Sequence, residues 1–471
     1  MSGTDLCYTP ALELARAIRE RAVSPVEVVD AVLARIEKLN PIVNAYCTVA
    51  ADQARAAAQK AEQSVMAGDT LGPLHGVPVS FKDLTPTAGI RTTFGSKIFE
   101  HNIPTEDAVL VQRVKAAGGI TIGKTNTAEF GCKGVTDNRI FGVTRNPWNP
   151  ALVAGGSTGG GAAALVCGMA PLAEGSDLAG SIRIPSACCG VVGLKTTPGR
   201  VPTYPQPNGW ASLSVHGPLA RTVRDAALML QVMSGADPRD PISLPGSGED
   251  FVAACDQPIG KPRLAWSRDL GYAPVEPIVA RIAEAAAKSF LELGCSVDEA
   301  HPGFEDPDLL FRSLTGPMRA AELAPYAQWV DEVDPILSGR IRTADNMTAS
   351  DYERRLHQRT ELYQKLRVFF ETYDFLLTPT ISVLPFPVDA PFPPTHVAGR
   401  PIASPIGWFP FTFPFNLAGV PAITIPAGWT DDGLPVGLQI VGPRLAEAGV
   451  LRLAAAFEAA RPWADRRPSL G

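Results

Sequence analysis

Two glycine-rich clusters constrain this chain more than any other feature. The first, residues 154–161, reads AGGSTGGG, and the second, residues 176–185, reads SDLAGSIRIP. An ordered glycine loses much backbone entropy, so a dense run needs a reason, such as close approach of backbone N–H groups to a negative charge. Each cluster holds a serine, Ser157 and Ser181, and a small-residue helix is expected between them at 161–166. Two tight turns of this kind can bring the serines to one point.

Three kinds of site use glycines in this way. A phosphate-binding loop ends in Gly-Lys followed by Ser or Thr, and no Lys follows these glycines. A dinucleotide fingerprint lies between a strand and a helix, but Pro147 and Pro150 disfavour a strand here. Residues 155–159 match G-x-S-x-G, the nucleophile elbow of serine hydrolases, which needs the same strand and a later His as base. Because that strand is not expected, Ser157 is a weak candidate for an elbow nucleophile.

A lysine is a better candidate for the base than any histidine. The chain has six histidines, and none lies in a recognisable motif: His75, His101, His216, His301, His357 and His396. Lys82 ends a short apolar run bounded by Pro78, which predicts a buried strand. Burial disfavours the charged form of a lysine and lowers its pKa. A neutral Lys82 can therefore accept a proton from a serine hydroxyl.

Lys82, Ser157 and Ser181, with their surroundings, resemble the Ser-cisSer-Lys triad of the amidase signature family. The similarity extends in order over nearly the whole chain, through these segments: 76–83, 89–96, 123–126, 146–149, 155–157, 177–185, 189–195, 414–421 and 433–439. Two positions depart from the family pattern, with Thr158 in place of a second serine and Ala179 in place of a glycine. Thr158 keeps a hydroxyl and Ala179 keeps its N–H, and neither departure removes a triad member.

The resemblance implies a role for each of these residues. Ser181 is expected to attack an amide carbonyl carbon, and Ser157, after a cis peptide bond, to relay the serine proton to neutral Lys82. The backbone N–H groups expected to form the oxyanion hole, which stabilises charge in the transition state, are those of Leu178, Ala179, Gly180 and Ser181. No cofactor and no metal are expected.

The resemblance also implies the fold. We expect an α/β fold in which a large mixed, mostly parallel central sheet is covered by helices on both faces. One amidase domain is expected over residues 1–471, with N-terminal helices at about 10–67 covering the core or forming the face of a possible homodimer.

The residues themselves support an α/β pattern. A strand is predicted at 77–81, a helix at 106–117 and a strand at 120–122, and this alternation favours a buried, mostly parallel sheet. Lys124 follows the second strand and is a rival for the base. The neighbouring loop signals place it less deeply than Lys82, so we interpret it as structural.

A proline-rich segment near the C-terminus is the candidate wall of the substrate pocket. Residues 381–415 hold many prolines and several aromatic residues, among which the pocket is predicted at Trp408, Phe409, Phe411 and Phe413. A proline-fixed aromatic loop suits an apolar acyl or aryl pocket. Ordinary packing of the loop onto the core is an equally good interpretation.

Composition excludes several classes of protein. The net charge of −6 and the absence of a long basic run give no indication of nucleic-acid binding. Eight cysteines are scattered without zinc-site spacing, which favours buried or reduced thiols. The N-terminus lacks the pattern of a secretory signal, and no stretch is apolar enough to span a membrane, so a cytoplasmic protein is expected.

The function predicted from these features is hydrolysis of a small or medium carboxylic amide, with an aryl amide, ester or carbamate as further possibilities. The alternative is the amidase subunit of a tRNA-dependent amidotransferase complex, which has similar motifs. The aromatic loop at 408–415 and the lack of a basic face favour the first. A non-catalytic binding protein is a third option, which the joint presence of Lys82, Ser157 and Ser181 argues against.

Overall fold

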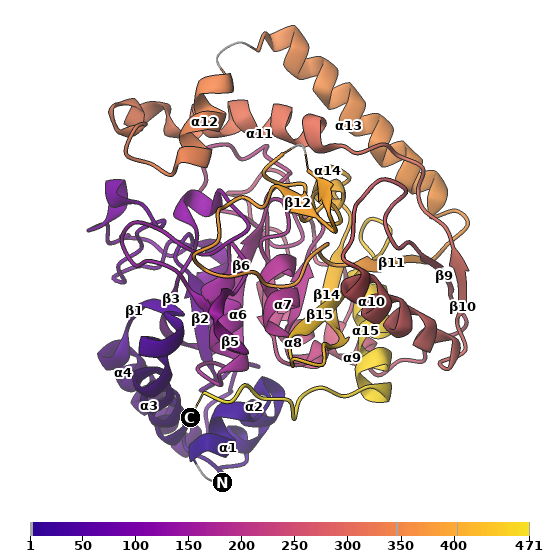
Figure 1. Ribbon diagram of the computed structural model, residues 1–471. Coiled ribbons are helices and arrows are strands. Elements are labelled where there is room, and N and C mark those ends of the chain that lie inside the picture. The colour runs from indigo at the N-terminus through magenta and orange to yellow at the C-terminus, as the bar shows by residue number, and fades with distance from the viewer. Residues whose placement is uncertain (1–2, 345–346, 403, 471) are drawn as a thin grey trace.

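The computed structural model describes residues 3–344, 347–402 and 404–470, and within these the chain folds around an 11-stranded sheet (Figure 1). The expected large mixed sheet with helices on both faces is confirmed. Parallel pairs join β3, β2 and β6 and also β11, β9 and β10, whereas the neighbours between β6 and β11 are antiparallel. The strand order is β1 (Tyr46–Val49), β3 (Ile120–Thr125), β2 (Pro78–Lys82), β6 (Leu172–Asp177), β8 (Val215–Ala220), β7 (Val192–Lys195), β14 (Ala422–Trp429), β15 (Pro435–Val441), β11 (Phe375–Pro379), β9 (Arg263–Trp266) and β10 (Ser296–Glu299).

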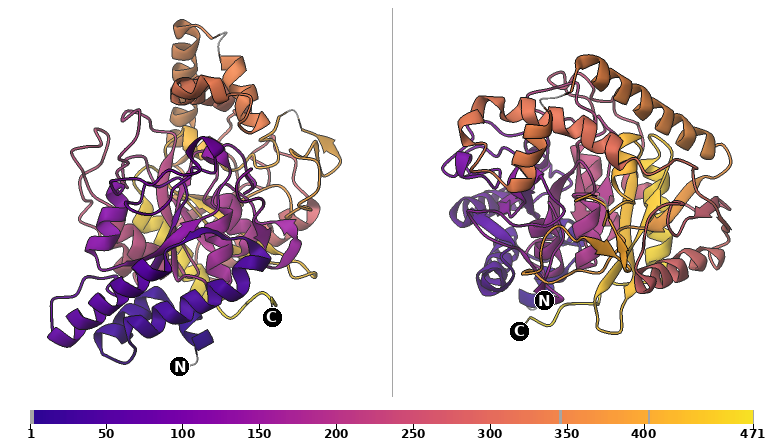
Figure 2. Two further views of the ribbon diagram at one scale, coloured as in Figure 1. Left: turned by 90° about the vertical axis from the view of Figure 1, so that its left-hand side faces the viewer. Right: turned by 45° about the horizontal axis from the view of Figure 1, so that its top comes forward.

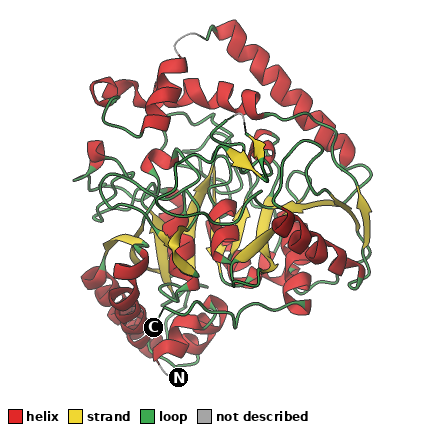
Figure 3. Cartoon of the chain, in the orientation of Figure 1, coloured by secondary structure: helices red, strands yellow, loops and turns green. Residues whose placement is uncertain are grey.

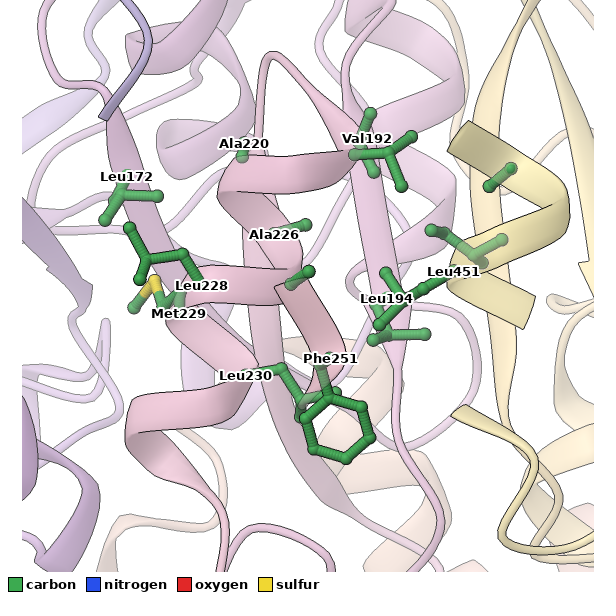
Figure 4. Packing of buried hydrophobic residues seen from close by; sticks show 14 of the residues in the cluster. Leu172, Val192, Leu194, Ala220, Ala226, Leu228, Met229, Leu230, Phe251 and Leu451 are labelled. Atoms are coloured by element: carbon green, nitrogen blue, oxygen red, sulfur yellow. The ribbon is translucent and has the colours of Figure 1, made fainter. Parts of the chain in front are cut away.

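One face of the sheet packs on a large apolar cluster. In Figure 4, Leu172, Val192 and Leu194 of the strands lie close to side chains of α8 and α15. Each such side chain contributes about 1.5–3 kcal/mol when it is fully removed from water. The helices that meet this cluster include α2 (Ala11–Arg19), α5 (Val109–Ala116), α8 (Val223–Met233), α9 (Phe251–Ala254), α10 (Pro277–Lys288) with the 3-10 turn η3 (Ser289–Leu291), and α15 (Glu447–Ala460).

The opposite face is covered by two short helices, α6 (Gly159–Val166) and α7 (Arg183–Cys189), and both are buried along their whole length. The N-terminal helices pack beside α6 through the buried residues Val29, Val32 and Ile36. These helices are α1 (Gly3–Tyr8), α3 (Pro25–Val43) and α4 (Ala51–Ala67). They therefore cover part of the core.

The helix starts follow the local sequence closely. At the start of α3, Ser24 accepts a hydrogen bond from the Val26 N–H at 2.9 Å, and the Glu27 carboxylate accepts one from the Ser24 N–H at 2.9 Å. Thr222 caps α8 by accepting from the Asp225 N–H. Both caps are predictable from the sequence because they depend on residues a few positions apart.

A second helical layer lies at the end of the molecule opposite the N-terminal helices (Figures 1 and 2). It consists of α11 (Asp308–Leu323), the 3-10 segment η4 (Ala324–Trp329), α12 (Pro335–Ala344) and α13 (Ala349–Phe369). Long loops connect this layer to the sheet, as Figure 3 shows in green. Other short elements are η1 (Lys97–Phe99), η2 (Glu129–Gly131), α14 (Phe413–Leu417), β12 (His396–Val397) and β13 (Arg400–Pro401).

The expectation that no strand precedes the first glycine cluster is wrong. Residues Asn149–Val153 form β5, which pairs with β4 (Arg145–Asn146) in a separate two-stranded sheet. Pro150 fits there because such a strand needs few ladder hydrogen bonds. The strand lies outside the main sheet, however, so the turn is still not an elbow projecting from that sheet.

Within the described residues, no helix has both the length and the apolar character needed to cross a membrane.

Candidate active site

Lys82 lies at the end of β2, with its side chain directed away from the large apolar cluster. Val79 and Phe81 belong to that cluster, and successive side chains of a strand alternate between the two faces. The Lys82 Nζ lies 2.8 Å from the Ser157 Oγ and 3.1 Å from the Ser176 Oγ. The residue is fully buried. The structure thus brings Lys82 and Ser157 into direct contact.

The environment of Lys82 favours its neutral form. Burial lowers the pKa of Lys82 from its ordinary value to about 7, against the opposing charges of Glu174 and Asp177. The positive charge of Arg319 lowers it further. A substantial fraction of Lys82 is therefore neutral near pH 7 and able to accept a proton.

Ser157 lies in the turn before α6, and its peptide bond with Gly156 is cis, as the resemblance implied. The glycines of this turn are explained by close backbone packing. A Cβ added at Gly156 would lie 2.4 Å from the carbonyl carbon of Val135, and one at Gly160 would lie 2.4 Å from the Asn126 nitrogen. The glycine run therefore lets the chain pass close to neighbouring backbone.

Ser181 lies in the turn between β6 and α7, with 8% of its surface exposed. The N–H of Thr158 donates to the carbonyl oxygen of Ser181 at 3.1 Å, which joins the two serine turns. Ser157, Ser176 and Ser181 all line one cavity of about 630 Å³. The two serines named from the sequence are therefore brought to the same cavity.

A buried ion pair holds the Ser181 turn. The Asp177 carboxylate accepts from the Arg183 Nη2 at 2.9 Å and from the Gly180 N–H at 2.8 Å. The Asn416 amide donates to the same carboxylate at 3.0 Å. Burial alone would raise the pKa of Asp177, but Arg183, together with Lys195 and Asn416, outweighs burial and holds the pKa at about 2. Asp177 and Arg183 thus fix the conformation of the turn.

The expected oxyanion hole needs one correction. The N–H of Gly180 is used by Asp177, so it does not face the cavity as a free donor. Among the described residues, no hydrogen-bond partner is found for the N–H groups of Leu178, Ala179 and Ser181. The set of unengaged amides around Ser181 is therefore three rather than four.

The wall of the large cavity includes both aromatic and polar side chains. The aromatic side chains are Phe94, Phe99, Phe130, Tyr204 and Tyr326. The polar side chains include His216, Arg319 and Glu322, of which Arg319 donates to Glu322 at 2.7 Å. Most of these residues come from loops and from the second helical layer.

The pocket predicted at Trp408, Phe409, Phe411 and Phe413 is corrected by the structure. Trp408, Phe411 and Phe413 are at most 1% exposed and do not line the large cavity, because they pack into the apolar core. Phe409 lines a separate, small cavity next to Ser181. The interpretation as ordinary core packing thus fits three of the four residues.

Lys124 is structural, but it is as deeply buried as Lys82, contrary to the expectation of shallower placement. Its Nζ donates to the carbonyl oxygen of Thr85 and, at 2.9 Å, to the Thr87 Oγ1. Burial lowers its pKa to about 8. Its partners belong to the loop after β2, so it shapes that loop.

One polar residue next to Lys82, Glu174, was not singled out from the sequence. Glu174 is fully buried; it accepts from the Lys82 backbone N–H at 3.2 Å, and its Oε1 lies 2.7 Å from the His216 Nδ1. Burial alone would raise the pKa of Glu174, but hydrogen bonds from His216 and Thr85 lower it. The signal available in the sequence was a glutamate within the otherwise apolar run 169–175, because an unpaired glutamate is almost never buried.

The cysteines do not offer a rival nucleophile. All eight are free, and burial raises the pKa of Cys188 to about 12 and that of Cys189 well above its ordinary value. Both stay protonated at neutral pH, and the thiolate is the reactive form. Likewise, no group of three His, Cys, Asp or Glu residues in the described part of the chain is placed to hold a metal ion.

Comparison with known proteins identifies relatives of this chain. The family model described as Amidase matches residues 27–451. An acylamidase of Rhodococcus erythropolis is 41% identical over 472 residues, which cover 100% of this chain and 99% of the relative. A glutamyl-tRNA(Gln) amidotransferase subunit of Roseiflexus sp. is 36% identical and covers 96% of both chains, so this relative is more distant.

The structural comparison agrees. A bacterial aryl acylamidase of the amidase signature enzymes superposes with a TM-score of 0.92 at 31% sequence identity, and the match covers 97% of both chains.

Proposed function

The chain belongs to the amidase family, and we propose that it hydrolyses amides through an acyl-enzyme formed on Ser181. Hydrolysis of amide C–N bonds itself follows from the family match and from the full-length similarity to an acylamidase. The observation that carries the proposed mechanism is the 2.8 Å contact between the Lys82 Nζ and the Ser157 Oγ, in the wall of the cavity that also holds Ser181.

The proposed reaction starts with attack of the Ser181 Oγ on the amide carbonyl carbon. As the C–O bond forms, the Ser181 proton passes to the Ser157 Oγ, whose own proton passes to the neutral Lys82 Nζ. When the C–N bond breaks, Ser157 delivers a proton to the leaving nitrogen and regains one from Lys82. Water then attacks the acyl-enzyme, releases the acid and restores Ser181. The low pKa of Lys82 supports the first proton transfer.

The negative charge that develops on the carbonyl oxygen needs donors that are already in place. In this proposal they are the N–H groups of Leu178, Ala179 and Ser181. The Asp177 carboxylate supports the arrangement because it holds the intervening Gly180 N–H at 2.8 Å. A donor of this kind is worth about 3–4 kcal/mol in the transition state.

The proposed substrate is a small-molecule amide with an apolar or aromatic part, and water is the second reactant. The five aromatic side chains of the large cavity support this class, as does the similarity to an aryl acylamidase. Esters and carbamates of similar shape are further candidates because the same attack on a carbonyl carbon would cleave them.

We also propose that residues 1–471 act as one amidase domain without a nucleic-acid partner. The net charge of −6 supports the second point. The eight free cysteines support a reducing, cytoplasmic location.

A homodimer would use the outer side of α3 and α4. Sedimentation velocity would distinguish a dimer from a monomer.

The test of the proposed function is turnover of a 4-nitroanilide by the wild type and by Ser181→Ala and Ser157→Ala. Both variants should lose nearly all activity. Ser214→Ala is the matched control, because Ser214 lines the same cavity without contact to Lys82. Mass spectrometry after treatment with a serine-directed acylating reagent should place the added acyl group on Ser181. Wild-type turnover by Ser181→Ala would exclude the mechanism.

A further inference from the structure

Ser181 lies between two cavities of very different size. The large one holds about 630 Å³, and a second one of about 20 Å³ lies beside the Ser181 turn. Besides Ser181, the small cavity is lined by Ala179 and by the apolar side chains of Ile184, Phe311, Ile406 and Phe409, and the charged residues Lys133 and Arg340 also reach its wall. Ser157 lines the large cavity and is absent from the small one.

The difference in size between the two cavities indicates where the acyl and amine parts of the substrate bind. We propose that the small cavity takes the acyl group and the large cavity takes the amine, so that the enzyme is selective for acetyl-sized amides of bulky, aromatic amines. The proposal rests on the proposed function, in which Ser157 gives a proton to the leaving nitrogen. That nitrogen must lie on the Ser157 side of the carbonyl carbon, which is the side of the large cavity. The acyl substituent then points the other way.

The size of the small cavity limits the acyl group. A single water needs at least about 10–15 Å³ of such space, so about 20 Å³ matches one water or one methyl group. The acetyl methyl fits, whereas each further methylene has to displace the wall. In an apolar pocket one methylene changes discrimination by about 10–200-fold.

The wall of the small cavity is backed by tight aromatic packing. Phe409 packs edge-on against Trp408 with ring centroids 4.8 Å apart, and Phe311 packs on Phe413 at 5.3 Å. A Cβ added at Gly134 would lie 2.6 Å from the Trp408 ring. Trp408 and Phe413 therefore act on substrate choice through Phe409 and Phe311, although neither lines the small or the large cavity.

The large cavity presents surfaces suited to an aryl amine. Phe94, Phe99 and Phe130 contact one another with centroids 5.0–6.4 Å apart, and Tyr326 packs on Phe99 at 5.1 Å. Aromatic rings favour offset or edge-to-face partners at such separations. An aniline ring placed here would continue an existing cluster.

The sharpest test uses two isomers, acetanilide and N-methylbenzamide, which contain the same atoms with acyl and amine parts exchanged. Rates are divided by those of hydroxide-catalysed hydrolysis, which removes the difference in leaving-group reactivity. We expect acetanilide to be preferred at least about tenfold in kcat/KM. A series of 4-nitroanilides should show a similar fall from acetyl to butyryl. Equal normalised rates for the isomers, or a rise with acyl length, would overturn the assignment.

Two variants locate the selectivity. Phe409→Leu and the milder Ile406→Val enlarge the small cavity and should raise the butyryl-to-acetyl ratio of kcat/KM, by about tenfold for Phe409→Leu. Phe457→Leu makes a similar substitution in the remote apolar cluster and should leave the ratio unchanged. Phe99→Leu, in the large cavity, should change the preference among amines and keep the acyl ratio. An unchanged acyl ratio in folded Phe409→Leu and Ile406→Val would overturn the proposal.

The experiments distinguish failure of the acyl-enzyme mechanism from failure of the cavity assignment. If Ser181→Ala keeps turnover, the acyl-enzyme mechanism is wrong and the assignment of cavities falls with it. If turnover needs Ser181 but shows no dependence on acyl size, the mechanism stands and only the assignment is wrong.

Discussion

The backbone N–H of Thr158 donates to the carbonyl oxygen of Ser181 at 3.1 Å. The residue after one serine is thus joined to the other serine through main-chain atoms alone. This explains how the chain tolerates Thr at position 158, since the link between the turns does not use that side chain. The spacing between Ser157 and Ser181 is set by backbone geometry and by the ion pair under the second turn.

The first prediction concerns the pH dependence of catalysis. Lys82 accepts the proton only when neutral, and burial lowers its pKa to about 7. The value of kcat/KM should therefore rise with pH to a plateau above about pH 7. Stopped assays between pH 5 and 9, with circular dichroism to confirm folding, would measure it. A profile that falls over this range would rule out a neutral-lysine base.

The second prediction concerns Glu174. Its negative charge favours the protonated form of Lys82, in the same direction as Asp177 and against Arg319. Glu174→Gln keeps the size of the side chain and removes the charge, so the rising limb of the pH profile should move to lower pH. His216→Asn is the companion variant because its amide can still donate to Glu174. If the rising limb of the pH profile of a folded Glu174→Gln protein stays at its wild-type position, Glu174 does not affect the pKa of Lys82.

The third prediction concerns the buried pair of Asp177 and Arg183, both fully buried. Arg183→Met leaves the Asp177 charge without its partner and should cost about 3–5 kcal/mol of unfolding free energy. Urea unfolding at pH 7 measures this loss. The double variant Arg183→Met/Asp177→Asn should recover part of it, because no charge is then left buried. Equal stability of the single variant and the wild type would contradict the assigned role.

The same pair predicts how stability responds to acid. The pKa of Asp177 is held at about 2 in the folded protein, below its ordinary value of 3.8. Its contribution is thus complete above about pH 4 and is lost as the pH falls toward 2. In Arg183→Met the loss of unfolding free energy between about pH 4 and pH 2 should be smaller than in the wild type. Unfolding curves recorded between pH 2 and 5 would measure it.

The fourth prediction compares two adjacent positions in the Ser181 turn. Gly180 has φ +124°, and an added Cβ would lie 2.5 Å from the Thr412 Oγ1. Gly180→Ala should therefore displace the neighbouring amides and lower kcat on the order of a hundredfold. Ala179→Gly restores the residue usual in the family, keeps the N–H and should retain activity. If both variants behaved alike, the geometry of Gly180 would not matter to catalysis.

Features that depend on neighbouring residues could be predicted from the sequence. The caps at Ser24 and Thr222 are of this kind. The burial of Lys82 could be inferred because the apolar run before it marks a strand of the interior. The resemblance of the segments around the two serines to the amidase signature family then predicted the overall fold.

Features that depend on distant partners could not be predicted. The burial of Glu174 in β6 is one example, because it depends on His216, which lies 42 residues later in the chain. The pocket prediction was wrong at Trp408, Phe411 and Phe413 for a related reason. An aromatic composition marks Trp408 as apolar, but not whether it faces a cavity or the core.

The outer wall of the large cavity comes from α11 and η4, through residues such as Leu323 and Tyr326, whereas Lys82 and the two serines belong to the sheet and its turns. Recognition of the amine and the machinery of bond cleavage thus reside in different parts of the chain. Substitutions in that helical layer can redirect the enzyme to another amine while the sheet stays intact. The amine specificity can therefore change through single substitutions in this helical layer while hydrolytic activity is kept at each step.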